Sequence, residues 1–394
     1  MPTLLQINIT ANWGSTGKIA EAIGAAALAH GWDSYIAYGR WCNPSQSHLI
    51  KIGGWSDECF HYAQQRFLDN EGLCSRNATK RLIRAIEAIK PDVVQLHNIH
   101  DHYLNYEILF EYLNQSGIKV VWTFHDCWAF TGHCFHFVTA SCEKWKTGCS
   151  DCPMKRVLPK TILDRSKKNY ELKRKLFGGC ENLTIVACSD WMAGFVRQSF
   201  LKDKRIEFIK NGVDLNVFRP LDRRPGNGLY SILAVSNVWN KEKGLYDLFR
   251  LREMLPEKYS MTIVGLSSKQ IKQLPAGIKG IERTQNVDEL VQLYSDADVL
   301  INPTYADTFP TVNLEALACG TPVITYRTGG SPESVSLETG VVVEQGDVAA
   351  MAEAIKDICG SDRERYAAAC RKRAEEHFDK NKCFERYIAL YRSL

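Results

Sequence analysis

A lysine, a helix start and a glutamate in the second half of the sequence have the types and spacing that bind a diphosphate and a ribose. Lys243 follows a short apolar run, and Pro310-Thr311 is expected to open a helix that also contains Glu315. The free backbone N–H groups at a helix start attract anions. Glu315 lies four residues after Thr311 on the same helical face, where its carboxylate can accept hydrogen bonds from a ribose diol. We therefore expect a diphosphate between Lys243 and these amides.

Two places in the first half are further candidates for ligand contacts. Gly14 and Ser15 lie in a small-residue loop that is expected to open a helix, and a tight structural turn is the alternative. His125 follows the apolar run 119–124, at the edge where a parallel sheet positions ligand-binding groups, and a structural histidine is the alternative. No G-x-G-x-x-G motif follows any expected strand, which argues against a dinucleotide-dependent oxidoreductase.

Five of the 14 cysteines fall within one short window, residues 127–152. Cys134, Cys142, Cys149 and Cys152 end in the C-x-x-C spacing of a zinc knuckle, and four thiolates suit a closed tetrahedral zinc site. Such a metal would shape the loop and leave no open position for chemistry. The alternative is a set of reduced thiols in an aromatic-rich loop. Because no secretion signal is recognisable, a metal is favoured over disulfides.

The basic residues are concentrated in one segment. Residues 155–175 hold nine Lys or Arg against Asp164 and Glu171, whereas the whole chain has a formal charge of only +4. The segment is either a solvated face or a contact for an anionic membrane or lipid diphosphate, at about 1 kcal/mol per basic residue near such a surface. The mild overall charge argues against nucleic-acid binding. Without a signal-like start or a run of about 20 apolar residues, a cytoplasmic protein is expected, with peripheral contact to the inner membrane face as an option.

The elements that must position these groups alternate short strands with longer helices, in two sets. With 394 residues the chain is too long for one core. The alternation indicates parallel sheets with crossover helices. The first set has expected strands at residues 4–9, 34–38, 92–96, 119–124, 183–187 and 206–209. The second set has expected strands at residues 231–235, 261–264, 299–301, 322–325 and 341–343.

These sets predict two doubly wound α/β domains. The first covers residues 1–215 with a Cys-rich loop at 127–153, and the second covers residues 228–375. A charged, Pro- and Gly-rich stretch at 218–228 suits a linker. Residues 376–394 predict a helix whose apolar stripe must be buried, and we expect it to cross back to the first domain. Open α/β sheets bind ligands at the carboxyl ends of their strands, so the two domains should face a shared cleft.

The second half resembles the donor domain of retaining family 4 glycosyltransferases, which have the GT-B fold of two Rossmann-like domains. The matching segments include Lys243-Gly244, the run 307–315 and the Gly-Gly-Ser-Pro-Glu segment 329–333, and residues 211–214 resemble the interdomain signature. The first half is similar to a bacterial capsule and exopolysaccharide branch of that family through residues 123–134 and the cysteines that follow.

This resemblance implies a role for each candidate residue. Lys243 would bind the donor diphosphate, Glu315 the ribose, and Asp307 with the amides that follow it the donor sugar. His125 would line the sugar site, so it joins Lys243 and Asp307 as a candidate catalytic residue. Asp307 stands where the family usually has a glutamate, and Pro310 replaces a common glycine and removes one N–H. The candidate donor-binding residues are Gly14, Ser15, Lys243, Gly265, Asp307, Thr308, Phe309, Pro310, Thr311 and Glu315.

The resemblance implies a retaining glycosyltransferase that moves a sugar from a nucleoside diphosphate sugar, a UDP- or GDP-sugar, to a hydroxyl of a growing surface polysaccharide or lipid-linked oligosaccharide. Lys243 and the helix start would stabilise the leaving diphosphate, so no cofactor is expected for catalysis and any zinc would be structural. A GT-B epimerase or phosphorylase would differ in its products. The alternative from another class is a zinc-stabilised, non-catalytic binding protein for an anionic polymer, which predicts steeply salt-dependent binding.

Overall fold

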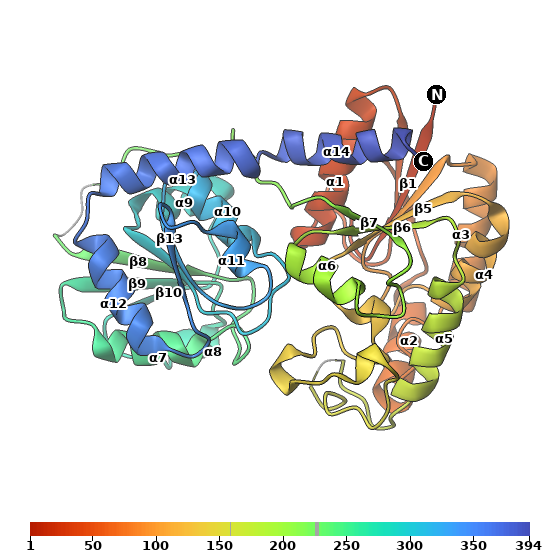
Figure 1. Ribbon diagram of the computed structural model, residues 1–394, viewed down its shortest axis with the longest axis horizontal. Helices are drawn as coiled ribbons and strands as arrows, with labels where there is room; N and C mark the ends of the chain where they lie inside the picture. The colour runs from red at the N-terminus through yellow and green to blue at the C-terminus, as the bar shows by residue number, and fades with distance from the viewer. Residues whose placement is uncertain (158, 225–227) are drawn as a thin grey trace. The chain divides into compact units, whose positions relative to one another are not determined.

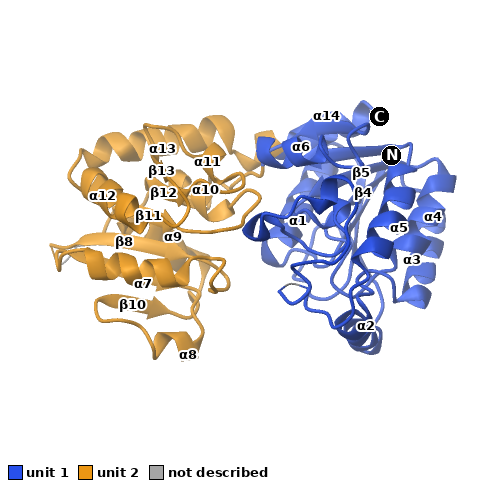
Figure 2. Cartoon of the chain, turned by 60° about the horizontal axis from the view of Figure 1, so that its bottom comes forward, with its two compact units in different colours: residues 1–210, 384–394 blue, residues 211–383 orange. Residues whose placement is uncertain are grey.

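The computed structural model describes residues 1–157, 159–224 and 228–394, which form two compact units (Figure 1). Unit 1 contains residues 1–210 and 384–394, and unit 2 contains residues 211–383, as Figure 2 shows by colour. The first unit therefore ends at residue 210 rather than at the expected 215. The linker expected at 218–228 includes residues 225–227, which lie outside the described ranges.

Unit 1 is built on a seven-stranded sheet in the order β3-β2-β1-β4-β5-β6-β7, and each strand pairs in parallel with its neighbours. The strand order reverses between β1 and β4, and open α/β sheets bind ligands at such a switch point. The strands are β1 Thr3–Asn8, β2 Asp33–Tyr38, β3 His48–Lys51, β4 Val93–Leu96, β5 Lys119–Phe124, β6 Leu183–Ala187 and β7 Arg205–Phe208. The helices are α1 Gly14–Ala29, α2 Trp55–Leu68, α3 Arg76–Ile89, α4 Tyr106–Ser116, α5 Ser166–Gly178 and α6 Asp190–Val196.

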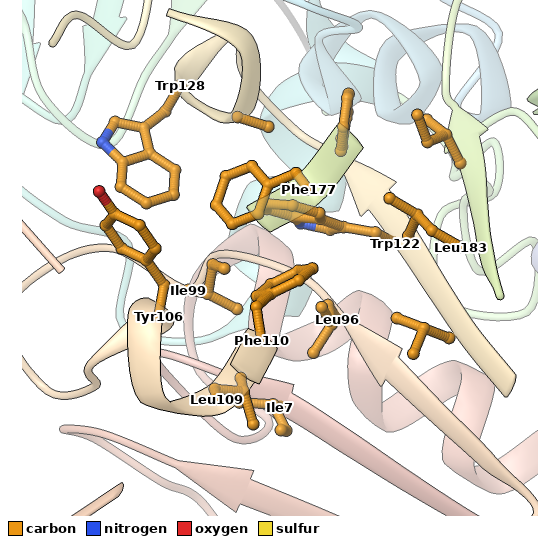
Figure 3. Close-up of a cluster of buried hydrophobic side chains, with 14 of the residues drawn as sticks. Ile7, Leu96, Ile99, Tyr106, Leu109, Phe110, Trp122, Trp128, Phe177 and Leu183 are labelled. Atoms are coloured by element: carbon orange, nitrogen blue, oxygen red, sulfur yellow. The ribbon is translucent and has the colours of Figure 1, made fainter. Parts of the chain in front are cut away.

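The core of unit 1 is rich in aromatic rings that meet between β5, α4 and α5 (Figure 3). Trp122 of β5 packs edge-on against Phe177 of α5 with ring centroids 5.0 Å apart, and Phe110 of α4 lies 4.4 Å from Phe177. Such pairs contribute about 0.5–1.5 kcal/mol each beyond the area they bury. The Trp122 indole N–H also donates to the His97 carbonyl at 2.8 Å. The core thus fixes the segment that follows β4.

The last helix, α14 Lys380–Arg392, ends in unit 1, to which the final 11 residues belong. Tyr387 and Thr123 share a hydrogen bond of 2.9 Å between their hydroxyls, and the Tyr391 hydroxyl donates to Gln95 Oε1 at 3.0 Å. Gln95 Nε2 donates to Thr123 Oγ1 at 2.9 Å, so the four buried side chains form a connected polar network. The expected return of the C-terminal helix to the first domain is confirmed, with a helix start at residue 380 rather than 376.

Unit 2 has a six-stranded parallel sheet in the order β10-β9-β8-β11-β12-β13, with its switch point between β8 and β11. Figure 1 shows α7, α8 and α12 on one side of this sheet and α9, α10 and α13 on the other. The strands are β8 Tyr230–Val235, β9 Tyr259–Val264, β10 Ile278–Ile281, β11 Val299–Asn302, β12 Val323–Tyr326 and β13 Gly340–Val343. The helices are α7 Leu245–Met254, α8 Ser268–Ile271, α9 Val287–Asp296, α10 Thr311–Ala318, α11 Ser331–Ser334, α12 Val348–Cys359 and α13 Arg363–His377.

The predicted pair of doubly wound parallel α/β domains is confirmed, but two strands were not expected. β3 and β10 are edge strands, and most of their residues are exposed or half-buried. Each of these two short strands also contains polar residues or a glycine and lacks a continuous apolar run, so the hydrophobic pattern carries no signal for it. Among the described residues, no helix combines the length and the apolar composition that crossing a bilayer requires.

Candidate functional site

Lys243 and Asp307 form an ion pair at the switch point of unit 2. Lys243 follows β8 and Asp307 follows β11, and these two strands are neighbours in the sheet. Lys243 Nζ lies 2.7 Å from Asp307 Oδ2, with 33% of the lysine side chain and 23% of the aspartate side chain exposed. The structure thus brings together two predicted site residues that are 64 positions apart, and both remain accessible to a ligand.

Close backbone contacts fix the segment that carries Lys243. The amide of Tyr305 donates to the carbonyl of Glu242 at 2.7 Å, which joins the segments after β8 and β11. Gly244 has a φ of 75°, and a Cβ at this position would lie 2.2 Å from the Pro303 carbonyl oxygen. Only glycine allows both the left-handed backbone and this approach. The backbone that carries Lys243 is therefore fixed, and the side chain extends from it to Asp307.

Helix α10 begins directly after the loop that carries the aspartate. Pro310 has an extended backbone and precedes the helix, which starts at Thr311, so Pro310 is not in the first turn as expected. The first amides of a helix lack intrahelical acceptors, and the helix dipole makes their surroundings attractive for an anion. Asn313 is buried in this turn, where it accepts from Asn302 Nδ2 and donates to Ser334 Oγ, both at 2.9 Å. These bonds hold the helix start in place.

Glu315 is oriented by a tyrosine that sequence reasoning missed. The Tyr294 hydroxyl of α9 donates to Glu315 Oε2 at 2.8 Å. Tyr294 is fully buried, and its burial and the glutamate raise its pKa well above the ordinary value, so it remains a neutral donor. Glu315 itself is half-buried. No spacing along the chain pairs these two residues, because they meet only through the packing of α9 against α10.

The other predicted donor-binding residues lie at the ends of strands or the starts of helices. In unit 2, Thr308 and Phe309 are buried just before α10, and Gly265 follows β9 with its amide bonded to the end of β10. In unit 1, Gly14 is the first residue of α1, and Ser15 is exposed in the first turn. All five positions are compatible with their expected roles, which stay predictions.

His125 belongs to a chain of hydrogen bonds at the switch point of unit 1. Gln6 Nε2 donates to the Ala20 carbonyl, so Gln6 Oε1 faces His97 Nε2 at 3.1 Å and must accept its proton. His97 Nδ1 is then an acceptor, and His125 Nε2 donates to it at 3.1 Å. Burial is the main cause that lowers the pKa of His125 to about 4, with Asp126 opposing this shift and His100 adding to it. The His125 ring is therefore neutral at pH 7.

A second polar cluster in unit 1 carries charge. His100 Nε2 lies 2.8 Å from Asp126 Oδ2, and His100 Nδ1 lies 3.4 Å from Asp101 Oδ2. Burial opposes a charge on this imidazole, but the two carboxylates outweigh it and raise the pKa of His100 to about 10. His102 Nε2 lies 3.0 Å from Glu71 Oε2 beside this group. Sequence reasoning did not find this cluster, since it forms only where separate loops meet.

The four predicted zinc ligands surround one small cavity in the loop between β5 and α5. The cavity measures about 10 Å³, and the aromatic rings of Phe137 and Trp145 also line it. Nowhere in the described chain do three of these sulfur atoms lie within 4.8 Å of one another. The thiols are therefore gathered without having ligand spacing, and zinc stays a prediction. The cysteines that line the cavity are Cys134, Cys142, Cys149 and Cys152.

Most of the basic side chains in residues 155–175 are exposed, as expected, but Lys173 is buried. Its Nζ donates to the carbonyls of Trp128 at 2.7 Å and Thr131 at 3.1 Å. Burial lowers the pKa of Lys173 to about 7. Residue 158 of this segment lies outside the described ranges. The exposed basic residues of the segment are Arg156, Lys160, Lys167, Lys168, Arg174 and Lys175.

Both halves of the chain match sequence models of known protein families. A sequence model described as Glycosyltransferase Family 4 matches residues 20–217, half of the chain. The chain belongs to glycosyltransferase family 4. A second model, described as Glycosyl transferases group 1, matches residues 230–361 of unit 2. Each parallel-sheet unit of this family 4 glycosyltransferase thus has a counterpart among known glycosyltransferase domains.

Relatives of this family 4 glycosyltransferase act in capsular and exopolysaccharide biosynthesis. A protein of Escherichia coli K12 named as the colanic acid biosynthesis glycosyl transferase WcaC is 24% identical, and the match covers 99% of this chain and 100% of the relative. The capsular polysaccharide biosynthesis glycosyltransferase CapM of Staphylococcus aureus is 28% identical over 47% of this chain and 52% of the relative. These relatives do not support the alternative of a non-catalytic binding protein.

Solved structures confirm the GT-B fold. Sucrose-phosphate synthase from Thermosynechococcus elongatus has a TM-score of 0.73 at 17% identity, covering 100% of this chain and 99% of that one. HepE from Anabaena, in complex with UDP and glucose, has a TM-score of 0.66 at 14% identity, covering 99% of both chains. At such identities the likeness carries the fold alone, and the roles of single residues in this glycosyltransferase stay predictions.

Proposed function

We propose that this enzyme is a retaining glycosyltransferase with a nucleoside diphosphate sugar as donor and a hydroxyl of a growing surface polysaccharide or lipid-linked oligosaccharide as acceptor. The observation that carries the proposal is the accessible Lys243–Asp307 ion pair beside the start of α10, at the switch point of unit 2. Relatives named for colanic acid and capsule support the acceptor class, and the donor nucleotide is proposed as UDP or GDP.

In the proposed complex, the diphosphate lies between the Lys243 ammonium and the first amides of α10. An ammonium and a helix start are both suited to phosphate oxygens. The ribose diol donates to the Glu315 carboxylate, which Tyr294 already orients. Asp307 then exchanges its contact with the lysine for a hydroxyl of the donor sugar. Because the lysine is held at 2.7 Å from this carboxylate, a bound diphosphate must share or replace that contact.

In the proposed reaction, the bond between the anomeric carbon and the diphosphate oxygen breaks, and the bond to the acceptor oxygen forms on the same face of the sugar. The acceptor proton passes to the departing diphosphate. Lys243 and the α10 amides stabilise the negative charge that grows on the leaving oxygen, and one preorganised donor of this kind is worth about 10²–10³ in turnover. These groups supply the positive charge in the proposal, so it requires no cofactor.

His125 is proposed as the unit 1 contribution to the reaction. Its ring is neutral at pH 7 because burial lowers the pKa to about 4, and His97 holds its orientation through the 3.1 Å hydrogen bond. A neutral, oriented imidazole can exchange hydrogen bonds with sugar hydroxyls without adding charge next to a developing oxocarbenium ion. His125→Ala should therefore lower turnover. The affinity for the donor nucleotide, which the proposal assigns to unit 2, should stay close to that of the wild type.

Donor binding can be tested by thermal shift with UDP, GDP, ADP and their common sugars, since a ligand that binds only the folded chain raises its melting temperature. We expect one nucleotide to stabilise the wild type, and Glu315→Gln to lose most of that shift. The matched control is Glu338→Gln, which alters an exposed glutamate of unit 2 outside the candidate site. No shift with any nucleotide would reject the proposed donor site.

The stereochemical part of the proposal needs product analysis. With the donor that binds, the anomeric proton of the new glycosidic bond can be read by NMR from its coupling constant. Retention predicts the same anomeric configuration in the donor and in the product. Inversion would leave the glycosyltransferase activity intact and reject only the proposed mechanism.

We further propose that unit 1 contacts an anionic lipid surface through an apolar patch of Phe60, Phe67, Ile162 and Leu163. Phe60 and Phe67 are seven residues apart on α2 and therefore share one face. The amide of Leu163 donates to the Phe67 carbonyl at 3.2 Å, so the segment that contains Ile162 lies alongside this helix. All four side chains are at least half exposed, between 52% and 61%. Exposed apolar patches of this kind mark interaction sites.

The charge beside the apolar patch favours an anionic lipid over other occupants. The same segment holds the exposed Lys160, Lys167 and Lys168, and basic residues at a membrane surface contribute about 1 kcal/mol each. Sedimentation with vesicles should show binding to phosphatidylglycerol and little to phosphatidylcholine. The double variant Phe60→Ser, Phe67→Ser should lose this binding, whereas Tyr246→Ser, an exposed aromatic residue of unit 2, should keep it. Equal binding to both vesicles would reject the surface.

A further inference from the structure

The loop between β5 and α5 gathers four thiols and a buried lysine that the proposed glycosyl transfer does not use. Cys134, Cys142, Cys149 and Cys152 line one cavity of about 10 Å³, with room for little more than a single ion. We propose that these four cysteines bind one structural zinc ion as thiolates, and that Lys173 balances the negative charge of the metal cluster.

A backbone amide already orients one of these sulfurs. The amide of Gly132 donates to Cys149 Sγ at 3.2 Å. An amide donor to the sulfur stabilises negative charge on it, which is what a metal-bound thiolate requires.

Lys173 provides an independent sign of negative charge in this region. It is 1% exposed, and its ammonium packs 3.3 Å from the centre of the Trp128 ring. In the part of the chain that the structure describes, its Nζ has no carboxylate within 4.0 Å. The nearest acidic groups are already used, since Asp126 pairs with His100 and Asp69 pairs with His133 at 2.6 Å. The direct contacts of its ammonium are therefore two carbonyl oxygens and an aromatic ring.

A zinc ion bound by four thiolates carries a net negative charge that would lie close to the Lys173 ammonium. Cys149, Asp126, Asp69 and Cys134 all interact electrostatically with Lys173. The carbonyls of Trp128 and Thr131 and the Trp128 ring offset part of the cost of burying this ammonium. The charge of the metal cluster would add to these contacts and hold Lys173 in its buried position.

Binding requires the loop to tighten around the ion. A zinc–sulfur distance of about 2.3 Å in a tetrahedral site puts neighbouring sulfurs about 3.8 Å apart. The described sulfurs do not yet form a set of three within 4.8 Å. The segment that must move contains two single turns, Val138–Ala140 and Lys144–Lys146, joined by irregular backbone. Such a segment can shift by about an ångström without breaking a strand or a long helix of the fold.

The direct test is the zinc content of the full chain, purified without chelators and measured by plasma mass spectrometry. We expect about one zinc per chain in the wild type and almost none in Cys149→Ser. Cys59→Ser changes an exposed thiol outside the loop and should keep the metal. Zinc below about one tenth per chain would overturn the proposal. An intact mass that shows a disulfide between two of the four cysteines would do the same.

Cobalt substitution keeps the proposal testable if Cys149→Ser fails to fold. Wild-type protein reloaded with Co²⁺ should show an intense thiolate-to-cobalt band and the visible spectrum of tetrahedral coordination, and a spectrum of octahedral cobalt would overturn the site. Lys173→Met leaves all four ligands in place and removes only the counter-charge. We expect it to lose metal to a chelator about 10–100-fold faster than the wild type, the size of effect seen when residues that contact metal ligands are substituted. An unchanged rate would overturn the role of Lys173.

Discussion

Units 1 and 2 share a Rossmann-like strand order but hold the polar residues of their switch points in different ways. In unit 2, Lys243 and Asp307 are partly exposed, and glycine turns and a helix start support them. In unit 1, the polar residues after β4 and β5 are buried or half-buried and hold one another, as His97 holds His125 and Asp126 holds His100. A partly exposed ion pair can exchange partners with a ligand, whereas side chains that are bonded to one another in a network keep their partners.

This contrast assigns different work to the two switch points. Unit 2 has the features of a site that binds and releases a charged ligand, since its cation is accessible and its amides face outward from a helix start. Unit 1 has the features of a preorganised surface, because a hydrogen bond to a neighbouring side chain fixes the orientation of each imidazole ring.

The largest expected effect is on turnover in unit 2. Lys243→Ala removes the cation proposed to stabilise the leaving diphosphate, and turnover should fall by about 10²–10³ with a melting temperature close to that of the wild type. Steady-state kinetics with the identified donor measures this. Lys269→Ala, at an exposed position of α8, is the control and should keep full turnover. Near-normal activity of Lys243→Ala would remove the lysine from the mechanism.

A pair of glycine substitutions compares the supports of the two units. Gly244 and Gly14 have similar left-handed φ values of 75° and 65°, but only at Gly244 would a Cβ clash, 2.2 Å from the Pro303 carbonyl oxygen. Gly14→Ala should cost about 1–2 kcal/mol from the backbone alone. Gly244→Ala should cost roughly 1–3 kcal/mol more because the two segments must separate. Urea unfolding gives both values, and equal costs would show that the contact is dispensable.

The hydrogen bond behind Glu315 has a smaller expected effect. Tyr294→Phe removes only the hydroxyl that donates to Glu315 Oε2, and one such bond to a charged group is worth about 1.5–3 kcal/mol. We expect weaker nucleotide binding by calorimetry, at the lower end of that range because Glu315 is half-buried. Tyr305→Phe removes a hydroxyl that donates to Asp247 at 2.7 Å and should leave nucleotide affinity unchanged. An equal loss in both variants would contradict a specific role for Tyr294.

The charge of His100 predicts a pH dependence of stability that belongs to unit 1. The pKa of about 10 in the folded chain lies above the ordinary value of 6.5, since the carboxylates of Asp126 and Asp101 outweigh the effect of burial. This stabilisation is fully present below pH 6.5 and is lost as the pH rises through about 10. The melting temperature of the wild type should therefore approach that of His100→Asn over this window. His48→Asn, an exposed control, should show no such convergence.

Local patterns predicted the fold and the outline of the unit 2 site. Buried parallel strands produce apolar runs, and α10 begins one residue from its expected start because Pro310 marks it. Lys243, Asp307 and Glu315 follow strands or start helices in segments that resemble a known family, so each could be named from its neighbours. Their common location at one switch point follows from the strand order, which only the structure shows.

The features that could not be predicted depend on contacts between distant segments. Tyr294 reaches Glu315 only through the packing of α9 on α10, and Glu71 joins His102 across two loops. Lys173 was counted with the exposed basic residues, since a charge run is usually solvated, yet it is buried against Trp128. No periodicity along the chain reports such contacts. The apolar patch of exposed phenylalanines on α2 likewise could not be predicted, because it depends on the position of this helix beside residues 162–163.

The measurement that tests the central claim most directly is a crystal structure of the full chain with UDP. The account predicts phosphate oxygens within hydrogen-bond distance of Lys243 Nζ and the first amides of α10, with the ribose hydroxyls on Glu315. A nucleotide bound elsewhere, with the Lys243–Asp307 ion pair intact and α10 uncontacted, would contradict the assignment of the donor site to the switch point of unit 2.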